Sequence, residues 1–287
     1  MSEFPVGDAV PPAPVPGAPV ARRFVGKVAF VTGAARGQGR AEAVRLAAEG
    51  ADIIALDINR SLATTRYPGP TPADLAETVA LVEKLGRRIV AVEADVRDYD
   101  AVRNAVTEGV STLGRLDVVI ANAGATTAAH CWEIEAEQWQ EAIDVNLTGA
   151  FHTAKAALRV LLHQGSGGSI VFTSSVAGLR GAPFLASYSA AKHGVVGLAT
   201  SLANELAPYR IRVNSVHPNG VDTELKVHEL FALLDANPYA RPYYTGSLPE
   251  TISESEDIAA AVAWLASDEA RHVTGIQLAV DRGRLSR

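Results

Sequence analysis

A tyrosine and a lysine past the middle of the chain have the types and spacing needed for proton transfer. Tyr188 and Lys192 stand four positions apart in a long helical pattern at 188–207, so both side chains lie on one helix face. An ammonium group beside a phenol favours the phenolate, and we expect the pKa of Tyr188 to be lowered from about 10. The pair predicts acid–base chemistry at a carbonyl or alcohol oxygen.

Two serines come before this pair, directly after a short apolar run that predicts a buried strand. The run is Gly-Ser-Ile-Val-Phe-Thr, and Ser174 and Ser175 follow it. A hydroxyl held opposite the tyrosine could orient the oxygen that exchanges the proton. Interconversion of an alcohol and a carbonyl also needs a hydride acceptor, so a cofactor site is expected elsewhere in the chain.

A glycine-rich turn near the N-terminus predicts that site. A strand pattern at 27–32 leads into Gly33, Gly37 and Gly39, and an amphipathic helix pattern then runs to Gly50. Glycines permit a tight turn and the close approach of a pyrophosphate, which the helix N-terminus would face. The spacing G-x-x-x-G-x-G departs from the G-x-G-x-x-G fingerprint, so the turn alone leaves a purely structural role open.

An acidic residue at the end of the second strand favours a dinucleotide. Asp57 ends the apolar run 52–57, close to the expected spacing for a ribose-binding carboxylate. A carboxylate there would accept hydrogen bonds from ribose hydroxyls and repel a 2′-phosphate. Ile58 stands where an NADP-dependent enzyme more often has a cation, although Arg36 could meet that phosphate. We therefore predict NAD.

Alternating strand and helix patterns predict a single-domain, doubly wound (Rossmann) α/β fold, with a parallel sheet of about seven strands and helices on both faces. We expect this catalytic domain at 24–287, after a flexible Pro/Ala-rich tail at 1–23. Ser253 and Glu256 predict a capping box for the last helix. The further strands are expected at 89–93, 116–121, 211–217 and 276–280, and the further helices at 73–85, 99–113 and 137–162.

Four features each allow two interpretations. The loop at 60–72 is longer than usual and could be a cofactor cover or a tolerated insertion. The apolar segment 224–253, within an expected lid at about 219–253, could cover a hydrophobic ligand or contact another helix or subunit. Asp95 could touch an adenine or cap a helix. Asn146 is a poor mid-helix residue and could be functional or a satisfied buried amide.

Composition argues against several classes of protein. The formal charge of −6, without a basic cluster, argues against nucleic-acid binding. Cys131 is the single cysteine, so an internal disulfide is impossible and a cytoplasmic location fits. The chain has no apolar run long enough to span a membrane, and residues 1–20 do not resemble a signal peptide. His130 and Cys131 lack partners at metal-ligand spacing, so we predict no metal and expect them at the pocket wall or surface.

The glycine-rich turn, the serine and the tyrosine–lysine pair, together with the further motifs named below, follow one another in an order that resembles the short-chain dehydrogenase/reductase family over residues 27–281. The resemblance implies that Tyr188 is the general acid/base and that Ser175, rather than Ser174, holds the reacting oxygen. It implies that Lys192 lowers the pKa of the tyrosine and holds the nicotinamide ribose, and that Asn146 holds a water in a proton relay. The motifs are Thr32-Gly33-x-x-x-Gly37-x-Gly39, Asn122-Ala123-Gly124, Asn146, Ser175, Tyr188-x-x-x-Lys192 and Pro218-x-Gly220.

The same resemblance implies the NAD-binding residues. They come from the glycine-rich turn, the ends of the strands, the catalytic helix and the segment after the sixth strand. They are Gly33, Ala35, Arg36, Gly37, Gln38, Gly39, Asp57, Ile58, Asp95, Val96, Asn122, Ala123, Gly124, Tyr188, Lys192, Pro218, Gly220, Val221 and Thr223.

The segments 33–40, 51–58, 192–197 and 217–223, with the long loop at 60–72, resemble the mycofactocin-associated subgroup. This subgroup includes carveol dehydrogenase-like enzymes. The likeness implies a tightly held, poorly exchanging NAD under the long loop, a mycofactocin redox partner and, from the wider family, a homotetramer. The ending Val-Asp-Arg-Gly-Arg-Leu-Ser-Arg is more basic than is usual there.

We therefore predict an NAD-dependent oxidoreductase that interconverts a hydrophobic secondary alcohol, such as the cyclic terpenoid carveol, and its ketone. One alternative is a 3-oxoacyl or hydroxysteroid dehydrogenase of the same family with exchangeable NAD. Another is a non-catalytic NAD-binding sensor, although such proteins usually lose the tyrosine or the lysine.

Overall fold

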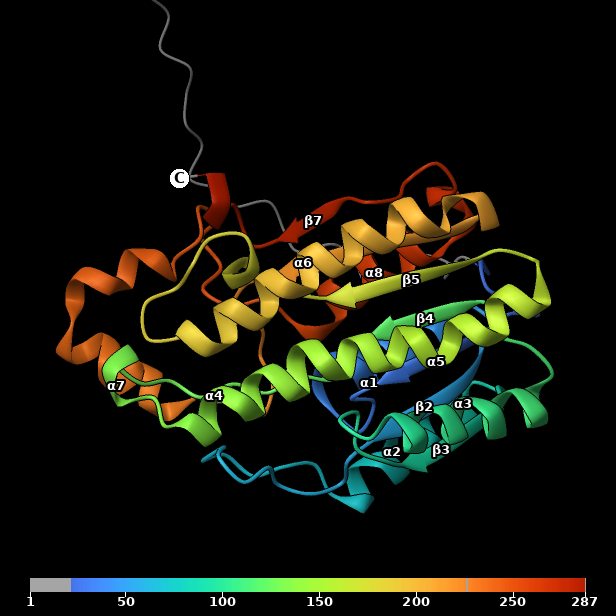
Figure 1. Cartoon of the computed structure of the whole chain (residues 1–287), viewed down its shortest axis with the longest axis horizontal. Coiled ribbons are helices and arrows are strands. Elements are labelled where there is room, and N and C mark those ends of the chain that lie inside the picture. Colours follow the sequence, from blue (N-terminus) through green and yellow to red (C-terminus); the bar gives the residue numbers. More distant parts are fainter. Residues whose placement is uncertain (1–21, 226, 287) are drawn as a thin grey trace, which may run out of the picture.

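A seven-stranded parallel sheet forms the centre of the molecule (Figure 1). The computed structural model describes residues 22–225 and 227–286, so most of the expected N-terminal tail lies outside the described residues. The strand order is β3-β2-β1-β4-β5-β6-β7, which confirms the predicted doubly wound α/β fold. The strands are β1 (Val28–Thr32), β2 (Asp52–Asp57), β3 (Ile89–Glu93), β4 (Val118–Ala121), β5 (Gly168–Thr173), β6 (Ile211–Pro218) and β7 (Gln277–Val280).

The central strands are covered on both faces, which explains their continuous apolar runs. Every residue of β1, β2 and β4 is buried, whereas β3 and β7 at the two edges have only partly buried and exposed positions. Thr32 of β1 pairs with Leu56 of β2, and Val31 pairs with Ile120 of β4. The carboxyl ends of these three strands therefore meet at one edge of the sheet.

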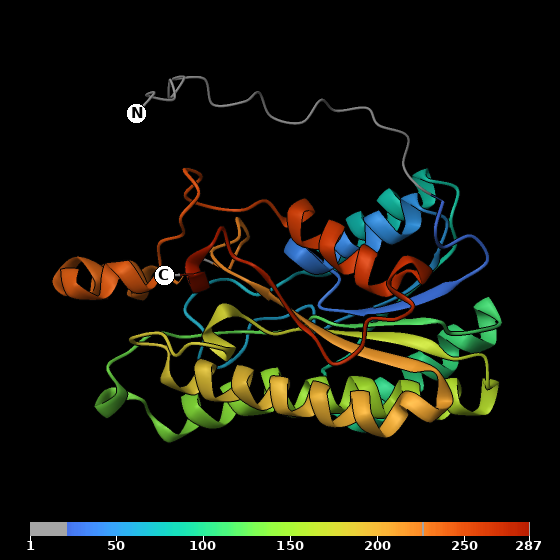
Figure 2. The ribbon, with the colours of Figure 1, turned by 90° about the horizontal axis from the view of Figure 1, so that it is seen from above.

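Helices form a layer on each face of the sheet (Figure 2). One apolar core joins the sheet to α3, α5 and α6, and a second joins it to α1, α2 and α8. Helix α7 lies apart, beyond the carboxyl edge of the sheet (Figure 2). None of the described helices is long and apolar enough to cross a membrane. The helices are α1 (Gly37–Ala48), α2 (Pro72–Lys84), α3 (Tyr99–Leu113), α4 (Ala136–Ile143), α5 (Gly149–Gln164), α6 (Ala186–Leu206), α7 (His228–Ala236) and α8 (Ser255–Ala266).

The expected helix at 137–162 contains a local irregularity at Asn146. A π-helical turn (Asp144–Thr148) separates α4 from α5. The side-chain Nδ2 of Asn146 donates to the carbonyl oxygen of Ala142 at 2.8 Å, and so takes an acceptor that the regular α-helical ladder would use. Single π turns inside helices occur often at functional sites.

The start of α8 differs from the predicted capping box. The N-cap is Glu254, whose backbone N–H donates to the carboxylate of Asp257 at 2.9 Å. Ser253 instead forms a β-bridge with Val221, and its hydroxyl accepts a hydrogen bond from Arg282 at 2.8 Å. Tertiary contacts thus use the serine, and the helix begins one residue later than the sequence pattern predicts.

Candidate active site

A cavity of about 570 Å³ lies at the carboxyl edge of the sheet, and it brings together nearly all the predicted site residues. It spans the point where β1 and β4 are neighbours, the usual ligand position in such sheets. Of the predicted cofactor residues, Ala35 and Gly39 do not line it, and of the catalytic ones Asn146 does not. This one space is lined by the turn after β1 and by the end of β2. It is also lined by Ser175, Tyr188 and Lys192.

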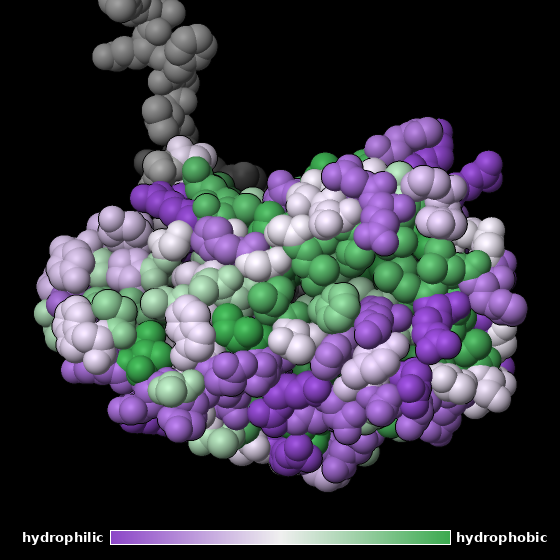
Figure 3. All heavy atoms as spheres, viewed as in Figure 1, coloured by the Kyte–Doolittle hydropathy of each residue, from purple (hydrophilic) through white to green (hydrophobic). Residues whose placement is uncertain are grey.

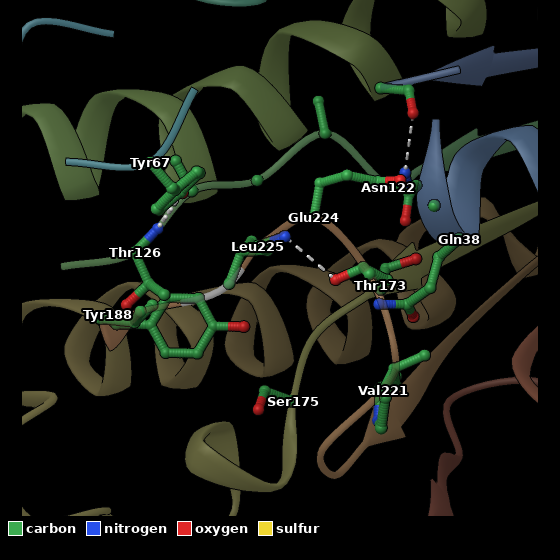
Figure 4. Close-up of a pocket in the computed structure, with 18 of the residues that line it drawn as sticks. Gln38, Tyr67, Asn122, Thr126, Thr173, Ser175, Tyr188, Val221, Glu224 and Leu225 are labelled. Atoms are coloured by element: carbon green, nitrogen blue, oxygen red, sulfur yellow. Dashed lines mark hydrogen bonds between the residues drawn. The ribbon is translucent and has the colours of Figure 1, made fainter. Parts of the chain in front are cut away.

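Tyr188 faces the cavity from the first turn of α6 (Figure 4). Enclosure by the surrounding protein raises the pKa of Tyr188 to about 12, and the hydrogen bond with Ser175 opposes this increase in part. The Ser175 hydroxyl also accepts the backbone N–H of Ala177 at 3.1 Å, which fixes its direction. The predicted lowering of the tyrosine pKa is therefore wrong for this arrangement.

Lys192 explains the difference. Its ammonium donates to the carbonyl oxygen of Thr173 at 2.7 Å, and its nitrogen lies 5.6 Å from the centre of the Tyr188 ring. Burial lowers the pKa of Lys192 to about 8. The lysine is thus held at the end of β5, where its remaining N–H donors are free to meet a ligand in the cavity.

The two adjacent serines have different surroundings. The Ser174 hydroxyl donates to the carbonyl oxygen of Lys192 at 3.0 Å, and so joins the end of β5 to α6. Ser175 is the next residue, and its hydroxyl forms a hydrogen bond with the side chain of Tyr188. The geometry favours Ser175 as the serine that meets a substrate oxygen.

Asn146 lies behind the cavity wall and is satisfied by the backbone. Its Nδ2 donates to Ala125 and Ala142, both at 2.8 Å, and its Oδ1 accepts from the N–H of Ala125 at 3.2 Å. A Cβ on Gly124 would lie 2.9 Å from this Oδ1 and 3.5 Å from the nitrogen of Lys192. The amide therefore fixes the wall beside the lysine, and its role in a water relay stays a prediction.

The glycine-rich turn has the shape that a dinucleotide requires. Gly33 has a positive φ of 70°, and a Cβ on Gly39 would lie 2.0 Å from the carbonyl oxygen of Gly33. Side chains are thus excluded where the N-terminus of α1 meets the cavity, and that end of a helix attracts anions. Gln38 also lines the cavity and has a buried Oε1 without a hydrogen-bond partner among the described residues. The turn fits a pyrophosphate.

Asp57 lines the cavity beside this turn. One carboxylate oxygen accepts the N–H of Ala35 at 2.8 Å, and the other accepts the N–H of Ile58 at 2.7 Å. Burial raises the pKa of Asp57, and these backbone hydrogen bonds oppose the increase. The acceptor is held in place at the end of β2, where a ribose would lie in the predicted mode.

Asp95 also lines the cavity, but it is not a helix cap. Its carboxylate pairs with Arg97 at 2.7 Å and with Arg60 at 3.1 Å. The N-cap of α3 is Asp98, which accepts the N–H of Ala101 at 3.1 Å. The capping alternative for Asp95 is therefore wrong, and contact with a ligand remains the interpretation in keeping with its position.

The remaining predicted cofactor residues line the cavity from β4 and from the segment after β6. Nδ2 of Asn122 donates to the carbonyl oxygen of Thr32 at 3.1 Å, and so holds the end of β4 against β1. A Cβ on Gly37 would meet Thr223 at 3.1 Å, which places that segment against the turn. The others are Val96, Ala123, Gly124, Pro218, Gly220 and Val221.

Sequence reasoning missed Tyr67, which enters the cavity from the long loop. Its hydroxyl accepts the backbone N–H of Thr126 at 3.2 Å (Figure 4), and its ring packs in the same apolar cluster as Tyr188. The loop is held by Arg36, which donates to the carbonyl oxygen of Pro68 at 2.6 Å. An aromatic residue in an otherwise polar loop was the available signal.

Glu141 on α4 was also missed, and it holds the other arm of this loop. Its carboxylate accepts the N–H groups of Ala63 at 3.1 Å and Thr64 at 2.9 Å, and the Thr64 hydroxyl at 2.5 Å. Nothing in the sequence distinguishes this acid from others on an amphipathic helix. The loop at 60–72 is thus an ordered part of the cavity wall.

The apolar segment after β6 forms the opposite wall. Val227, Leu230, Leu233 and Tyr244 pack in the cluster that contains Tyr188. Glu229 of α7 pairs with Arg66 of the long loop at 3.6 Å. The position favours the interpretation as a lid.

His130 and Cys131 do not line the cavity. Cys131 is exposed, as one of the two expected locations requires. His130 is partly buried between Trp132 and Phe184, whose ring centres lie 4.6 Å and 5.2 Å from its own. The part of the chain that the structure describes holds no cluster of side chains suited to a metal ion.

Comparison with a family model identifies the short chain dehydrogenase family over residues 27–230. The curated (−)-trans-carveol dehydrogenase of Rhodococcus erythropolis is 46% identical over 91% of this chain and 98% of its own length.

Two solved structures are also similar. One is a short chain dehydrogenase from Mycobacterium paratuberculosis bound to NAD, with 47% identity, a TM-score of 0.90, and coverage of 92% of this chain and 100% of the other. The second is a carveol dehydrogenase from Mycobacterium avium in complex with NAD, with 48% identity, a TM-score of 0.88, and coverage of 92% and 99%.

Proposed function

The chain belongs to the short-chain dehydrogenase/reductase family and is an NAD-dependent oxidoreductase that acts on alcohols, and we propose that it interconverts a hydrophobic secondary alcohol and its ketone. The observation that carries the proposal is that Ser175, Tyr188 and Lys192 face one cavity together with the glycine-rich turn and Asp57. Acid–base groups and a dinucleotide site thus share one space.

The described residues fit NAD. The N-terminus of α1, with Gly33 and Gly37, would hold the pyrophosphate, and Asp57 would accept from the adenosine ribose. Lys192 would meet the nicotinamide ribose with the N–H donors that Thr173 leaves free.

The side chains divide the acid–base work in oxidation. Bound NAD supplies the acceptor for the hydride that leaves the carbinol carbon. Tyr188 takes the hydroxyl proton of the alcohol, and Ser175 holds the same oxygen by a hydrogen bond. Because the tyrosine pKa is high before a ligand enters, positive charge from Lys192 and from the oxidised nicotinamide is needed to favour the phenolate. In reduction, Tyr188 returns the proton to the developing alkoxide.

The walls of the cavity support a hydrophobic substrate. Its apolar lining comes from the residue that precedes α6 and from the proposed lid, and carveol, a cyclic secondary alcohol, is a substrate of this kind. The relevant lining residues are Leu185, Leu225, Val227, Leu230, Phe231 and Leu234.

Two further proposals concern NAD and its reoxidation. The loop at 60–72 lines the cavity and is held by Arg36 and Glu141, which supports its role as a cover over a poorly exchanging NAD. A cofactor that stays bound must be reoxidised in place, and a mycofactocin redox partner would serve this step.

The assembly and location are proposals of the same kind. Hydrophobic residues gather on the surface over α5 and α6 (Figure 3), and Phe151 and Leu162 of α5 are exposed. This supports a homotetramer packed through the long helices. The single cysteine, Cys131, supports a location in the cytoplasm.

The alternative function is a 3-oxoacyl or hydroxysteroid dehydrogenase with exchangeable NAD. A non-catalytic sensor is disfavoured because Ser175, Tyr188 and Lys192 are all in place.

Native mass spectrometry of the purified protein would report the subunit count and retained NAD(H) together. Dialysis, an absorbance scan and turnover assays with carveol would follow. Free exchange of NAD with turnover of 3-oxoacyl or steroid substrates alone would support the alternative, and no turnover of any alcohol would contradict the proposal.

A further inference from the structure

A buried arginine beneath the lid uses little of its hydrogen-bonding capacity. Arg284 is 3% exposed, and its Nη1 donates to the side-chain oxygen of Asn219 at 2.8 Å. Its Nε and Nη2 have no hydrogen-bond partner among the described residues. A buried cation that lacks an anionic partner is costly, so the site is electrostatically incomplete.

The neighbouring acid Asp281 does not complete it. The carboxylate of Asp281 accepts the backbone N–H groups of Gly283 at 2.9 Å and Leu285 at 2.8 Å. Burial lowers the pKa of Arg284, Tyr244 and Asp281 oppose this decrease, and the charge of Arg180 adds to it. Arg284 is therefore a buried cation whose Nε and Nη2 donors are unused among the described residues.

Arg284 lines the same cavity as Tyr188. Its guanidinium lies 5.2 Å from the centre of the Tyr244 ring, and this ring packs in the apolar cluster of Tyr188 and Leu185. An apolar wall thus leads from the catalytic tyrosine to the cation. Glu224 also lines the cavity, but it lies at the other end, beside the glycine-rich turn. A Cβ added to Gly37 would be 3.8 Å from the carboxylate of Glu224.

We propose that Arg284 binds a carboxylate on the substrate, so that the alcohol oxidised is a hydrophobic hydroxy acid with its acid group remote from the hydroxyl. The inference rests on the proposed function and names its substrate class. Arginine presents a planar fork of donors that suits a carboxylate. Side chains including Tyr244 cover the unused nitrogens, so the lid must shift to admit the acid group.

Calorimetry with non-reacting ligands tests this directly. Cyclohexanecarboxylate and cyclohexanecarboxamide have the same ring and nearly the same shape, and each is titrated into the NAD-loaded protein. We expect the carboxylate to bind on the order of tenfold to a hundredfold more tightly. Arg284→Met should reduce its affinity to that of the amide, Arg284→Lys should keep part of the preference, and Arg271→Met, at an exposed position, should keep all of it.

Equal binding of the two ligands to the unaltered protein would overturn the proposal, and this comparison does not depend on the folding of any variant. A preference that survives in folded Arg284→Met would also overturn it.

Because neither ligand is oxidised, the result is independent of turnover. A protein that prefers the carboxylate but oxidises no alcohol would contradict the proposed function alone, whereas a protein that oxidises neutral alcohols and binds both ligands equally would contradict this inference alone.

Discussion

The carboxylate of Glu141 accepts the backbone N–H of Thr64 at 2.9 Å, and so joins helix α4 to the long loop beside the cofactor cavity. Glu141 does not line the cavity itself. A change at this residue therefore tests the loop without removing a group that could touch NAD.

Glu141→Gln should speed the loss of NAD. The amide keeps the shape but loses the charge that two backbone N–H groups and the Thr64 hydroxyl share. Hydrogen bonds to charged groups are worth about 1.5–3 kcal/mol, so we expect release on the order of tenfold faster, measured by dialysis and absorbance. Glu137→Gln, on the exposed face of the same helix, is the control. Equal release from both variants would argue against the loop as a cover.

Tyr188→Phe should keep NAD and lose turnover. The phenyl ring preserves the packing with the lid but has no proton to exchange, and general acid–base catalysis is typically worth about 10²–10⁴-fold. The measurements are kcat with an alcohol substrate and retained NAD by mass spectrometry. Tyr209→Phe, where the tyrosine is 56% exposed, should change neither. Full turnover in Tyr188→Phe would refute the assigned role.

Gly39→Ala should abolish NAD binding. The added Cβ would lie 2.0 Å from the carbonyl oxygen of Gly33, so the turn must change shape. Circular dichroism and calorimetry with NAD separate loss of binding from loss of fold. At Gly181 an added Cβ would meet nothing within 4 Å, and Gly181→Ala should bind NAD normally. Normal binding by Gly39→Ala would mean that this turn does not hold the dinucleotide.

Glu42 should make stability depend on pH. It is fully buried on α1, its carboxylate has no hydrogen-bond partner among the described residues, and burial raises its pKa to about 8. Between the ordinary pKa of 4.5 and about 8, the folded state keeps a proton that the unfolded chain loses, so this residue makes stability fall as pH rises.

Glu42→Gln removes this dependence. Its free energy of unfolding, relative to that of the unaltered protein, should rise by on the order of a few kcal/mol from pH 5 to pH 8. The difference between the two proteins cancels other titrating groups, and denaturant melts at both pH values measure it. The exposed Glu83→Gln should show no such rise. A constant difference for Glu42→Gln would place the charge of Glu42 in contact with water.

The strands were predictable because strands that are buried on both faces have continuous apolar sequences. The apolar runs that end at Thr32 and Asp57 needed no tertiary information, and parallel pairing then brought their ends to one edge. The spacing of Tyr188 and Lys192 likewise placed both on one face of α6. Local periodicity determines these features.

Features that depend on distant partners were not predictable. The hydroxyl of Tyr67 accepts a hydrogen bond from the backbone N–H of Thr126. The ammonium of Lys192 donates to the carbonyl oxygen of Thr173 rather than to Tyr188. Ser253 is drawn into a bridge with Val221, so Glu254 caps α8 instead. In each case an interaction across the fold outweighed the preference of the local sequence.

Tyr67 belongs to the loop at 60–72, and its ring packs against the same apolar cluster as Leu230 and Tyr244 of the proposed lid. The proposed cover and the proposed lid, which come from distant parts of the chain, therefore share one apolar cluster. A substrate that orders the proposed lid should stabilise this cluster and raise the affinity for NAD. Thermodynamic linkage makes the effect reciprocal: retained NAD, by ordering the loop, should raise the affinity for substrate.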